Sequence, residues 1–272
     1  MSYLKDREIW LPRTPAEGDN PPVGYFWKFI EDGVVVVRDS DGVDRKPVSL
    51  LKSSITYQIG SGGDYATINE ALEDVTSKYY PVYKSEGVRV TLNLVAGFEM
   101  EEQVLVDGID LSWITITGTD AETTIIRSAL TTVINNRFPA FVVSNAGYLP
   151  IIGQLFDMDS SGGSTNRDGI ALNGASQCIV LSGAGVKNNC DRGLRCIETS
   201  RAFVRGSIFT GATTRGFESF AGSVINARDA DGSGAGVQGF RVAVGGIIAC
   251  DGSTGSLSQT ANTITSNGII FR

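Results

Sequence analysis

The sequence predicts an all-β protein: a right-handed parallel β-helix, a short solenoid with one capping helix, preceded by a small N-terminal β-module. Three observations favour this fold class. The 272-residue chain contains 33 glycines and only 19% charged residues, which suits a turn-rich β protein. Apolar and polar residues alternate over many short runs, as in half-buried strands. One pattern of glycine and apolar residues also repeats with a period in the low twenties, which is typical of stacked repeat proteins.

The repeat is marked by a glycine in each turn of the expected solenoid. These glycines are Gly169, Gly193, Gly216, Gly239 and Gly268, with spacings of 24, 23, 23 and 29 residues. Positions 1 and 3 after the glycine are apolar in almost every repeat, and so are positions 9 and 11. Because alternate side chains of a strand share one face, each pair belongs to one face of a sheet. Stacked turns would align them in core columns: Ile170, Leu194, Phe217 and Phe240 at position 1, and Cys178, Ala202, Ile225 and Ile248 at position 9.

The number of turns follows from the length of the repeat region. About six or seven turns, each rising by the strand spacing of about 4.8 Å, give a rod about 30 Å long. A β-sandwich is the competing fold, because it also consists of short strands. A sandwich does not require the same residue classes every 23 positions, so the repeat favours the solenoid.

The N-terminal part, residues 1–55, differs in composition from residues 56–272. It holds five of the eight prolines and two of the three tryptophans. The stretch GYFWKFIEDGVVVVRDSDGVDRKPVSL predicts a β-hairpin or small meander with turns at Asp32-Gly33 and Asp41-Gly42. The first twenty or so residues form an extended arm in this interpretation, held by another subunit or a larger assembly.

A capping helix is expected over residues 64–79, between the N-terminal module and the first strands. Asp64 is the expected N-cap, and Ile68, Leu72 and Val75 share one helical face. Pro81 ends the helix. The helix would cover the open end of the solenoid, where the unpaired backbone groups of the first strands must be shielded from pairing with another chain.

The composition argues against several classes of function. The net charge of −7 offers no basic face for nucleic acid. No apolar run reaches membrane-spanning length, and the N-terminus lacks a signal-peptide core, so we expect synthesis in the cytoplasm. The chain has no histidine, which removes the commonest general base and metal ligand. The four cysteines show no metal-site or disulfide spacing. We expect no cofactor and no metal.

Three stretches together resemble phage tail spikes and tail fibres. They are IGSGGDYATINEALEDV, similar to the entry helix of pectate-lyase-like β-helices, PPVGYFWKFIEDGVVVVRDSDG, similar to N-terminal modules of phage fibres, and the C-terminal GGIIACDGSTGSLSQTANTITSNGIIF. The resemblance covers most of the chain. It implies a homotrimer attached by its N-terminus to a virion or phage-like particle, on the tail or on the capsid. It also implies contact with a cell-surface glycan.

The carboxylates do not predict a catalytic residue. Position 2 after each marker glycine reads Ala171, Arg195, Glu218 and Arg241. Stacking would place Glu218 between two arginines, and such neighbours lower the pKa of a carboxyl group. A lowered pKa favours a role for Glu218 in a ladder of ion pairs over a role as a general acid. Asp229 and Asp231 start like a calcium loop, but Phe240 stands where the twelfth-position Glu belongs, so a Gly-rich turn is the better interpretation. Two Gly-rich loops, in the stretches DMDSSGGSTNRD and NARDADGSGAG, hold the candidate glycan-contact residues. These are Asp157, Asp159, Arg167, Asp229 and Asp231.

Two further groups are candidates for contacts between proteins. Ile179 and Phe203 occupy position 10, which faces outward if positions 9 and 11 face the core. Either the register is shifted and both are core residues, or they line a trimer interface. Trp10, Pro12, Tyr25 and Trp27 are candidates for particle attachment. The alternation of residues favours a place in the core of the N-terminal module for Tyr25 and Trp27, whereas Trp10 has no strand partner in the sequence, which favours an anchoring role for it.

The functional hypothesis is a virion-mounted trimeric spike or fibre that adheres to host polysaccharide and is not an enzyme. One alternative is a polysaccharide depolymerase, hydrolase or lyase, on the same scaffold. The other is a purely structural adaptor or decoration protein. A groove with aromatic residues and two converging acids would favour the depolymerase.

Overall fold

The computed structural model describes most of the chain, and divides it into two compact units. The described residues are 8–10, 19, 26–31, 34–38, 44–45, 49–80, 87–161, 166–257, 264–265 and 267–272; only the backbone is described for those from 8 to 50 other than Asp19, and for 80 and 264–265. One unit contains residues 1–51 and 74–82, and the other contains residues 52–73 and 83–272.

The first unit contains a four-stranded sheet in the order β1-β2-β3-β4 and the short parallel pair β5-β7. Strands β2 and β3 pair antiparallel, as expected for the hairpin, and β4 continues antiparallel to β3. The strands are β1 (Glu8–Trp10), β2 (Phe26–Glu31), β3 (Val34–Arg38), β4 (Asp44–Arg45), β5 (Ser49–Leu50) and β7 (Tyr79–Tyr80).

The prediction that Trp10 lies in an extended arm without a strand partner is wrong. Trp10 ends β1, which pairs parallel with β2 so that Trp10 lies opposite Lys28. The free edge of the β2–β3 hairpin presents unpaired backbone groups, and a three-residue segment suffices to pair with them. The alternation rules find hairpins joined by short turns, but they do not find a parallel strand added from a distance.

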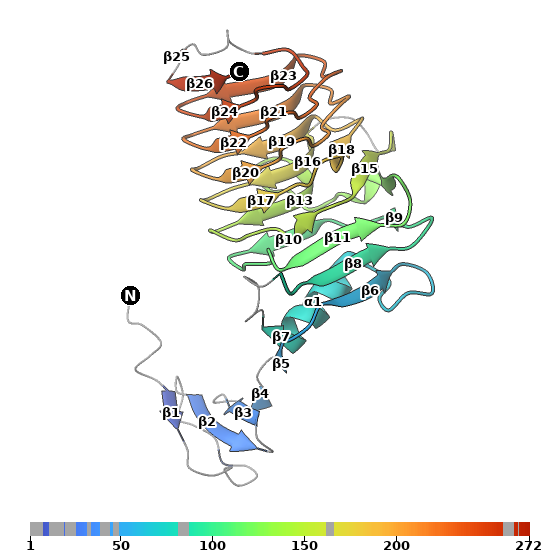
Figure 1. Ribbon diagram of the computed structural model, residues 1–272, viewed down its shortest axis with the longest axis vertical. Coiled ribbons are helices and arrows are strands. Elements are labelled where there is room, and N and C mark those ends of the chain that lie inside the picture. The colour runs from blue at the N-terminus through green and yellow to red at the C-terminus, as the bar shows by residue number, and fades with distance from the viewer. Residues whose placement is uncertain are drawn as a thin grey trace. The chain divides into compact units, whose positions relative to one another are not determined.

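The second unit is predominantly β, and its strands pair almost entirely in parallel. Each sheet takes one strand from each successive stretch of chain, and Figure 1 shows the strands stacked one above another from β6 to β26. The first two sheets are β6 (Ile55–Ile59), β8 (Val90–Leu94), β11 (Ile114–Gly118), β14 (Ile151–Ile152), and β9 (Glu99–Met100), β12 (Thr123–Ile125), β15 (Leu155–Met158), β18 (Gly185–Lys187).

Two six-stranded sheets complete this unit. The strands of one are β10 (Val104–Asp107), β13 (Phe138–Ser144), β16 (Arg167–Leu172), β19 (Arg192–Cys196), β21 (Arg215–Phe220) and β23 (Gln238–Ala243). The strands of the other are β17 (Gln177–Ile179), β20 (Arg201–Phe203), β22 (Val224–Asn226), β24 (Ile247–Ala249), β26 (Gly268–Phe271) and β25 (Ile264–Thr265). Only the last pair, β25 with β26, is antiparallel among the described strands of this unit.

The predicted core columns are confirmed. Leu194 pairs with Ile170 on one side and with Phe217 on the other, and all three are fully buried. The rings of Phe217 and Phe240 stack with their centroids 4.8 Å apart and 2° between their planes. All four cysteines are free and buried, and burial raises the pKa of Cys190 to about 12.

Glycine recurs at Gly169, Gly193 and Gly216 because a side chain there would strike the next turn of backbone. A Cβ atom on Gly169 would lie 2.6 Å from the carbonyl oxygen of Gly193, and one on Gly193 would lie 2.7 Å from that of Gly216. Gly216 would meet the oxygen of Gly239 at 2.8 Å. Only glycine allows this close approach of one backbone to another.

The helix α1 (Ile68–Lys78) is shorter at its start than predicted, and Asp64 does not cap it. The Asp64 carboxylate instead accepts a hydrogen bond from a backbone amide of β6 at 2.7 Å. Thr67 is the capping residue: its hydroxyl accepts from the amide of Glu70 at 3.1 Å. The Glu102 carboxylate accepts from the first two helical amides at 2.6 and 3.0 Å. A carboxylate from a distant turn thus satisfies amides that sequence reasoning assigned to a local cap.

Substituting Gly193 by alanine tests the backbone contact between turns. We expect G193A to lower the free energy of unfolding by about 2–3 kcal/mol, because the next carbonyl must move. Gly268 is the matched control, since its Cβ would meet a side chain, that of Val242, at 3.1 Å. G268A should change the stability by less than about 1 kcal/mol. Urea unfolding followed by circular dichroism measures both; equal losses would contradict the proposed contact.

Candidate functional site

The outer face of the sheet β17-β20-β22-β24-β26 is apolar over most of its area. In-register pairing aligns ten outward positions in two rows, and seven of them are apolar. We name these seven residues the apolar face: Ile179, Phe203, Val224, Ile247, Ala249, Ile269 and Phe271. The other three positions are Gln177, Arg201 and Asn226.

Ile179 and Phe203 lie where the repeat placed them. They are register partners in β17 and β20, and the neighbours Cys178 and Ala202 face the core. Phe203 is 48% exposed, as is Phe271 at the last turn. The shifted-register alternative, in which both are core residues, is therefore wrong.

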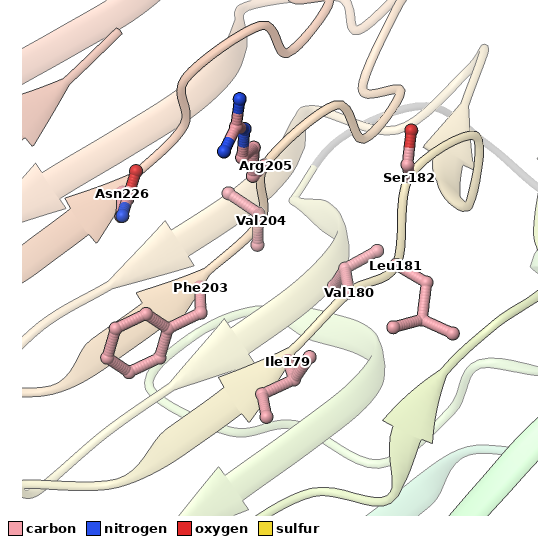
Figure 2. Close-up of a pocket in the computed structure, with 8 residues that line it drawn as sticks. All are labelled: Ile179, Val180, Leu181, Ser182, Phe203, Val204, Arg205 and Asn226. Carbon is pink, nitrogen blue, oxygen red and sulfur yellow. The ribbon is translucent and has the colours of Figure 1, made fainter.

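An open groove of about 250 Å³ runs along this face, between β17 and β20 and the turns that follow them. In the view of Figure 2, the polar ends of Ser182, Arg205 and Asn226 lie on one side, and Ile179 and Phe203 lie on the other. Its apolar side suits a buried hydrocarbon or aromatic surface. Two converging carboxylates, which a glycosidase needs, are not among the residues that line this groove.

A second feature lies on the sheet β10-β13-β16-β19-β21-β23. Eight charged side chains form one connected set of ion pairs, which we name the arginine network. Its members are Arg137, Arg192, Arg195, Arg215 and Arg241 with Asp168, Asp191 and Glu218.

Glu218 is the centre of this network. The predicted ladder is confirmed in its register: Glu218 lies between Arg195 and Arg241 on adjacent strands. Its carboxylate is 3.5 Å from Arg195 Nε and 3.3 Å from Arg215 Nη1, and it also pairs with Arg192 and Arg241. Burial alone would raise the pKa of Glu218, but these arginines outweigh it and hold the pKa below its ordinary value.

Asp168 and Asp191 extend the network toward the preceding turn. Arg137 Nε donates to Asp168 at 2.6 Å, and its terminal nitrogen pairs with Asp191. Arg192 Nη1 lies 2.9 Å from Asp191 and 3.9 Å from Asp168. Asp168 is fully buried, and this burial raises its pKa against the opposing effect of Arg137.

Three of the predicted glycan-contact residues lie together near the first Gly-rich loop, where each has a partner in its own chain. Asp157 accepts from Asn188 Nδ2 at 2.8 Å. Asp159 accepts from the Arg127 amide at 2.8 Å, and although burial opposes it, such hydrogen bonds lower the Asp159 pKa. The Arg167 guanidinium lies 4.3 Å from the centroid of the Phe138 ring and donates to a backbone oxygen.

The other two predicted residues lie about three turns further along the stack. Asp229 pairs with Arg205 at 3.1 Å, and both side chains are more than half exposed. Asp231 accepts from the Ser233 amide at 2.9 Å and from the Thr254 hydroxyl at 2.5 Å. Three turns correspond to about 14 Å, so the five residues do not form one site.

The attachment candidates belong to the first unit. The backbones of Trp10 and Trp27 lie in β1 and β2. Pro12 and Tyr25 lie outside the described residues.

Sequence reasoning found Glu218 and two of its arginines but missed the rest of the network. The missed signal is the residue just before each of the first four marker glycines, which reads Asp168, Arg192, Arg215 and Gln238. These residues are register partners, so the side chains of the first three form a second charged column beside the first. Arg137 and Asp191 lie in connections between strands and leave no periodic signal.

Neither a metal-binding cluster nor a membrane-spanning helix is found among the described residues. No group of three or more Cys, Asp or Glu side chains among them is placed to hold a metal ion. None of the described helices has the length and apolarity needed to cross a membrane.

Replacing Glu218 by glutamine tests whether the network stabilises the fold. We expect E218Q to lose about 3–5 kcal/mol of unfolding free energy at pH 7, because four arginines lose their shared carboxylate. Since the folded pKa of Glu218 is lowered, its contribution is complete above the unfolded pKa and disappears as the pH falls through the folded one. The gap between wild type and E218Q should therefore shrink at acidic pH.

The control for this measurement is D229N, which breaks the exposed pair with Arg205. It should cost less than about 1 kcal/mol. Urea unfolding at several pH values measures all three proteins. An E218Q variant as stable as wild type at pH 7 would show that the ion pairs contribute nothing net.

Comparison with models of protein families finds no match for this chain, and no curated protein matches it. The assignment of function therefore depends on the geometry and on the resemblance found in the sequence.

Proposed function

We propose that the second unit is a short right-handed parallel β-helix and that the protein is a trimeric spike or fibre of a phage-like particle, adhering to host surface polysaccharide. The β-helix is supported by parallel, in-register pairing between segments that are 23 or 24 residues apart. Among the named strands in the described part of this unit, the antiparallel pairing that a β-sandwich requires occurs only between β25 and β26; one isolated antiparallel bridge joins Ile134 and Arg137. In this interpretation α1 caps the first turn, and β25 covers the edge of the last described strand.

The observation that carries the proposal is the apolar face. It continues across five successive strands, with Phe203 and Phe271 each 48% exposed. An exposed apolar patch of this kind marks a surface for protein contact. Arg201 is the single charged residue among its ten outward positions, and the cores of subunit interfaces are similarly depleted of charge. A second and third copy of the same chain cover this face in the proposal.

The number of subunits and the location on a virion come from the resemblance to phage spikes and fibres. Three copies related by a three-fold axis bring the same face of each chain toward that axis. The N-terminal residues 1–55 attach the trimer to the particle in this proposal, with Trp10, Pro12, Tyr25 and Trp27 as the anchoring residues.

The described carboxylates favour adhesion over depolymerisation. A glycoside hydrolase needs a general acid with a raised pKa that reaches its substrate. Glu218 has a lowered pKa, and Asp168, whose pKa is raised, is fully buried. Burial also raises the pKa of Glu102, but both oxygens of this carboxylate accept hydrogen bonds from the first two amides of α1. The structural adaptor differs from the adhesin only in lacking a glycan ligand.

Light scattering of the purified chain tests the trimer. We expect three times the chain mass for the wild type and a monomer for F203E, because a charge on the apolar face must be desolvated at the contact. The control is V237E, at a residue that is 59% exposed but does not belong to this face. V237E should remain trimeric. A wild-type monomer would overturn the proposed assembly.

A second measurement separates the adhesin from its two alternatives. Incubation of the trimer with host surface polysaccharide should yield a complex in which the polymer keeps its length. Shortening of the polymer would show the depolymerase instead. A trimer that does not bind the polysaccharide would support the structural adaptor.

A further inference from the structure

We infer that the arginine network is a binding site for an anionic polysaccharide that carries carboxylate or sulfate groups. This inference depends on the proposed function, which it extends by naming the chemical class of the receptor. It also moves the glycan contact from the Gly-rich loops to the outer face of β16, β19, β21 and β23.

The first argument is the charge of the network. Five arginines share three carboxylates, so the set keeps a surplus of two positive charges. Four of the arginines pair with the one carboxylate of Glu218. Arg192 also pairs with Asp191, so the one charge of Glu218 stands against the other three arginines. The partial burial of these guanidinium groups favours binding of a further anion.

The second argument is unused hydrogen-bonding capacity. In the described part of the chain, the buried Nε atoms of Arg195 and Arg215 find no hydrogen-bond acceptor, although both groups are ion-paired. A guanidinium group carries five N–H donors in a planar arrangement that matches the oxygens of a carboxylate or sulfate. Glu218 Oε2 and Asp168 Oδ1 are likewise buried without a hydrogen-bond partner among the described residues. Because five guanidinium groups face only three carboxylates, the network still holds more donors than these acceptors use.

The third argument is access. The side chains of Arg195 and Arg241 are 22% and 30% exposed, while that of Glu218 is 3% exposed. A ligand that approaches this face meets guanidinium groups before it meets the carboxylate. Arg195 and Arg241 flank Glu218 from adjacent strands, so they lie about 10 Å apart along the stack and are able to contact successive groups of a polymer.

The net charge of the whole chain confines the attraction for a polyanion to the surface of the arginine network. At a net charge of −7 the protein repels a polyanion on average, so attraction requires a concentrated positive patch. Binding should weaken as salt rises, because the exposed part of the attraction is screened.

The test compares two double substitutions that remove the same formal charge. R195Q/R241Q removes the exposed arginines and leaves Glu218 paired with Arg192 and Arg215. The control K78Q/R228Q removes a lysine and an arginine that are 53% and 50% exposed and pair elsewhere. Thermal unfolding establishes that both variants are folded. The probes are oligogalacturonate for carboxylates, dextran sulfate for sulfates and neutral dextran, with Kd measured by calorimetry at several salt concentrations.

We expect the wild type to bind at least one anionic probe, more weakly as salt rises, and not to bind neutral dextran. R195Q/R241Q should raise the Kd at least about tenfold, since two charge-assisted contacts are lost, and the control less than about threefold. The probe that binds identifies carboxylate or sulfate as the preferred group.

Several results would overturn the inference. One is that the wild type binds neither anionic probe. Another is that the two double variants lose the same affinity for the probe. A third is that R195Q/R241Q no longer forms the trimer. The last result would assign the arginines to a carboxylate of a second copy. A trimer that binds host polysaccharide but neither anionic probe would leave the proposed function intact and reject only this site. A wild-type monomer would reject the proposed assembly, and the comparison of variants would still decide the site.

Discussion

Close backbone contact between successive turns is the constraint on which the rest of the second unit depends. At Gly169, Gly193 and Gly216 the backbone of one turn lies so near the next that no Cβ atom fits between them. This contact holds the strands in register, and register decides which side chains face the core and which face outward. The buried phenylalanine stack and the outward rows therefore share one cause.

The same register accounts for the two different outer faces. Where identical positions are apolar in successive turns, stacking builds the apolar face; where they are charged, it builds the arginine network. Arg192 and Arg215 are direct register partners, an arrangement that is repulsive by itself. Glu218 offsets this repulsion by pairing with both arginines, so a single carboxylate stabilises the pairing of two neighbouring strands.

Periodic features of the sequence predicted what the structure shows, and features that depend on distant contacts were missed. The core columns, the outward position of Phe203 and the place of Glu218 between two arginines all follow from counting residues after a glycine. The start of α1 does not: Asp64 bonds to β6, Thr67 is the local cap in its place, and Glu102, more than thirty residues away, accepts from the first helical amides. Trp10 in β1 is similar, since pairing with β2 crosses a long connection. In the network, Arg137 and Asp191 lie between strands, where the period carries no information.

The in-register pairing of segments 23 residues apart has a consequence for how this protein can vary. An insertion or deletion of one whole turn preserves every column and shifts the following strands by one strand spacing, about 4.8 Å. An insertion or deletion of any other length within a strand shifts its register, so its apolar and charged side chains no longer align with those of the neighbouring strands. Variation in length is therefore quantised: such proteins can lengthen or shorten their outer faces in steps of one strand, while the connecting loops vary freely.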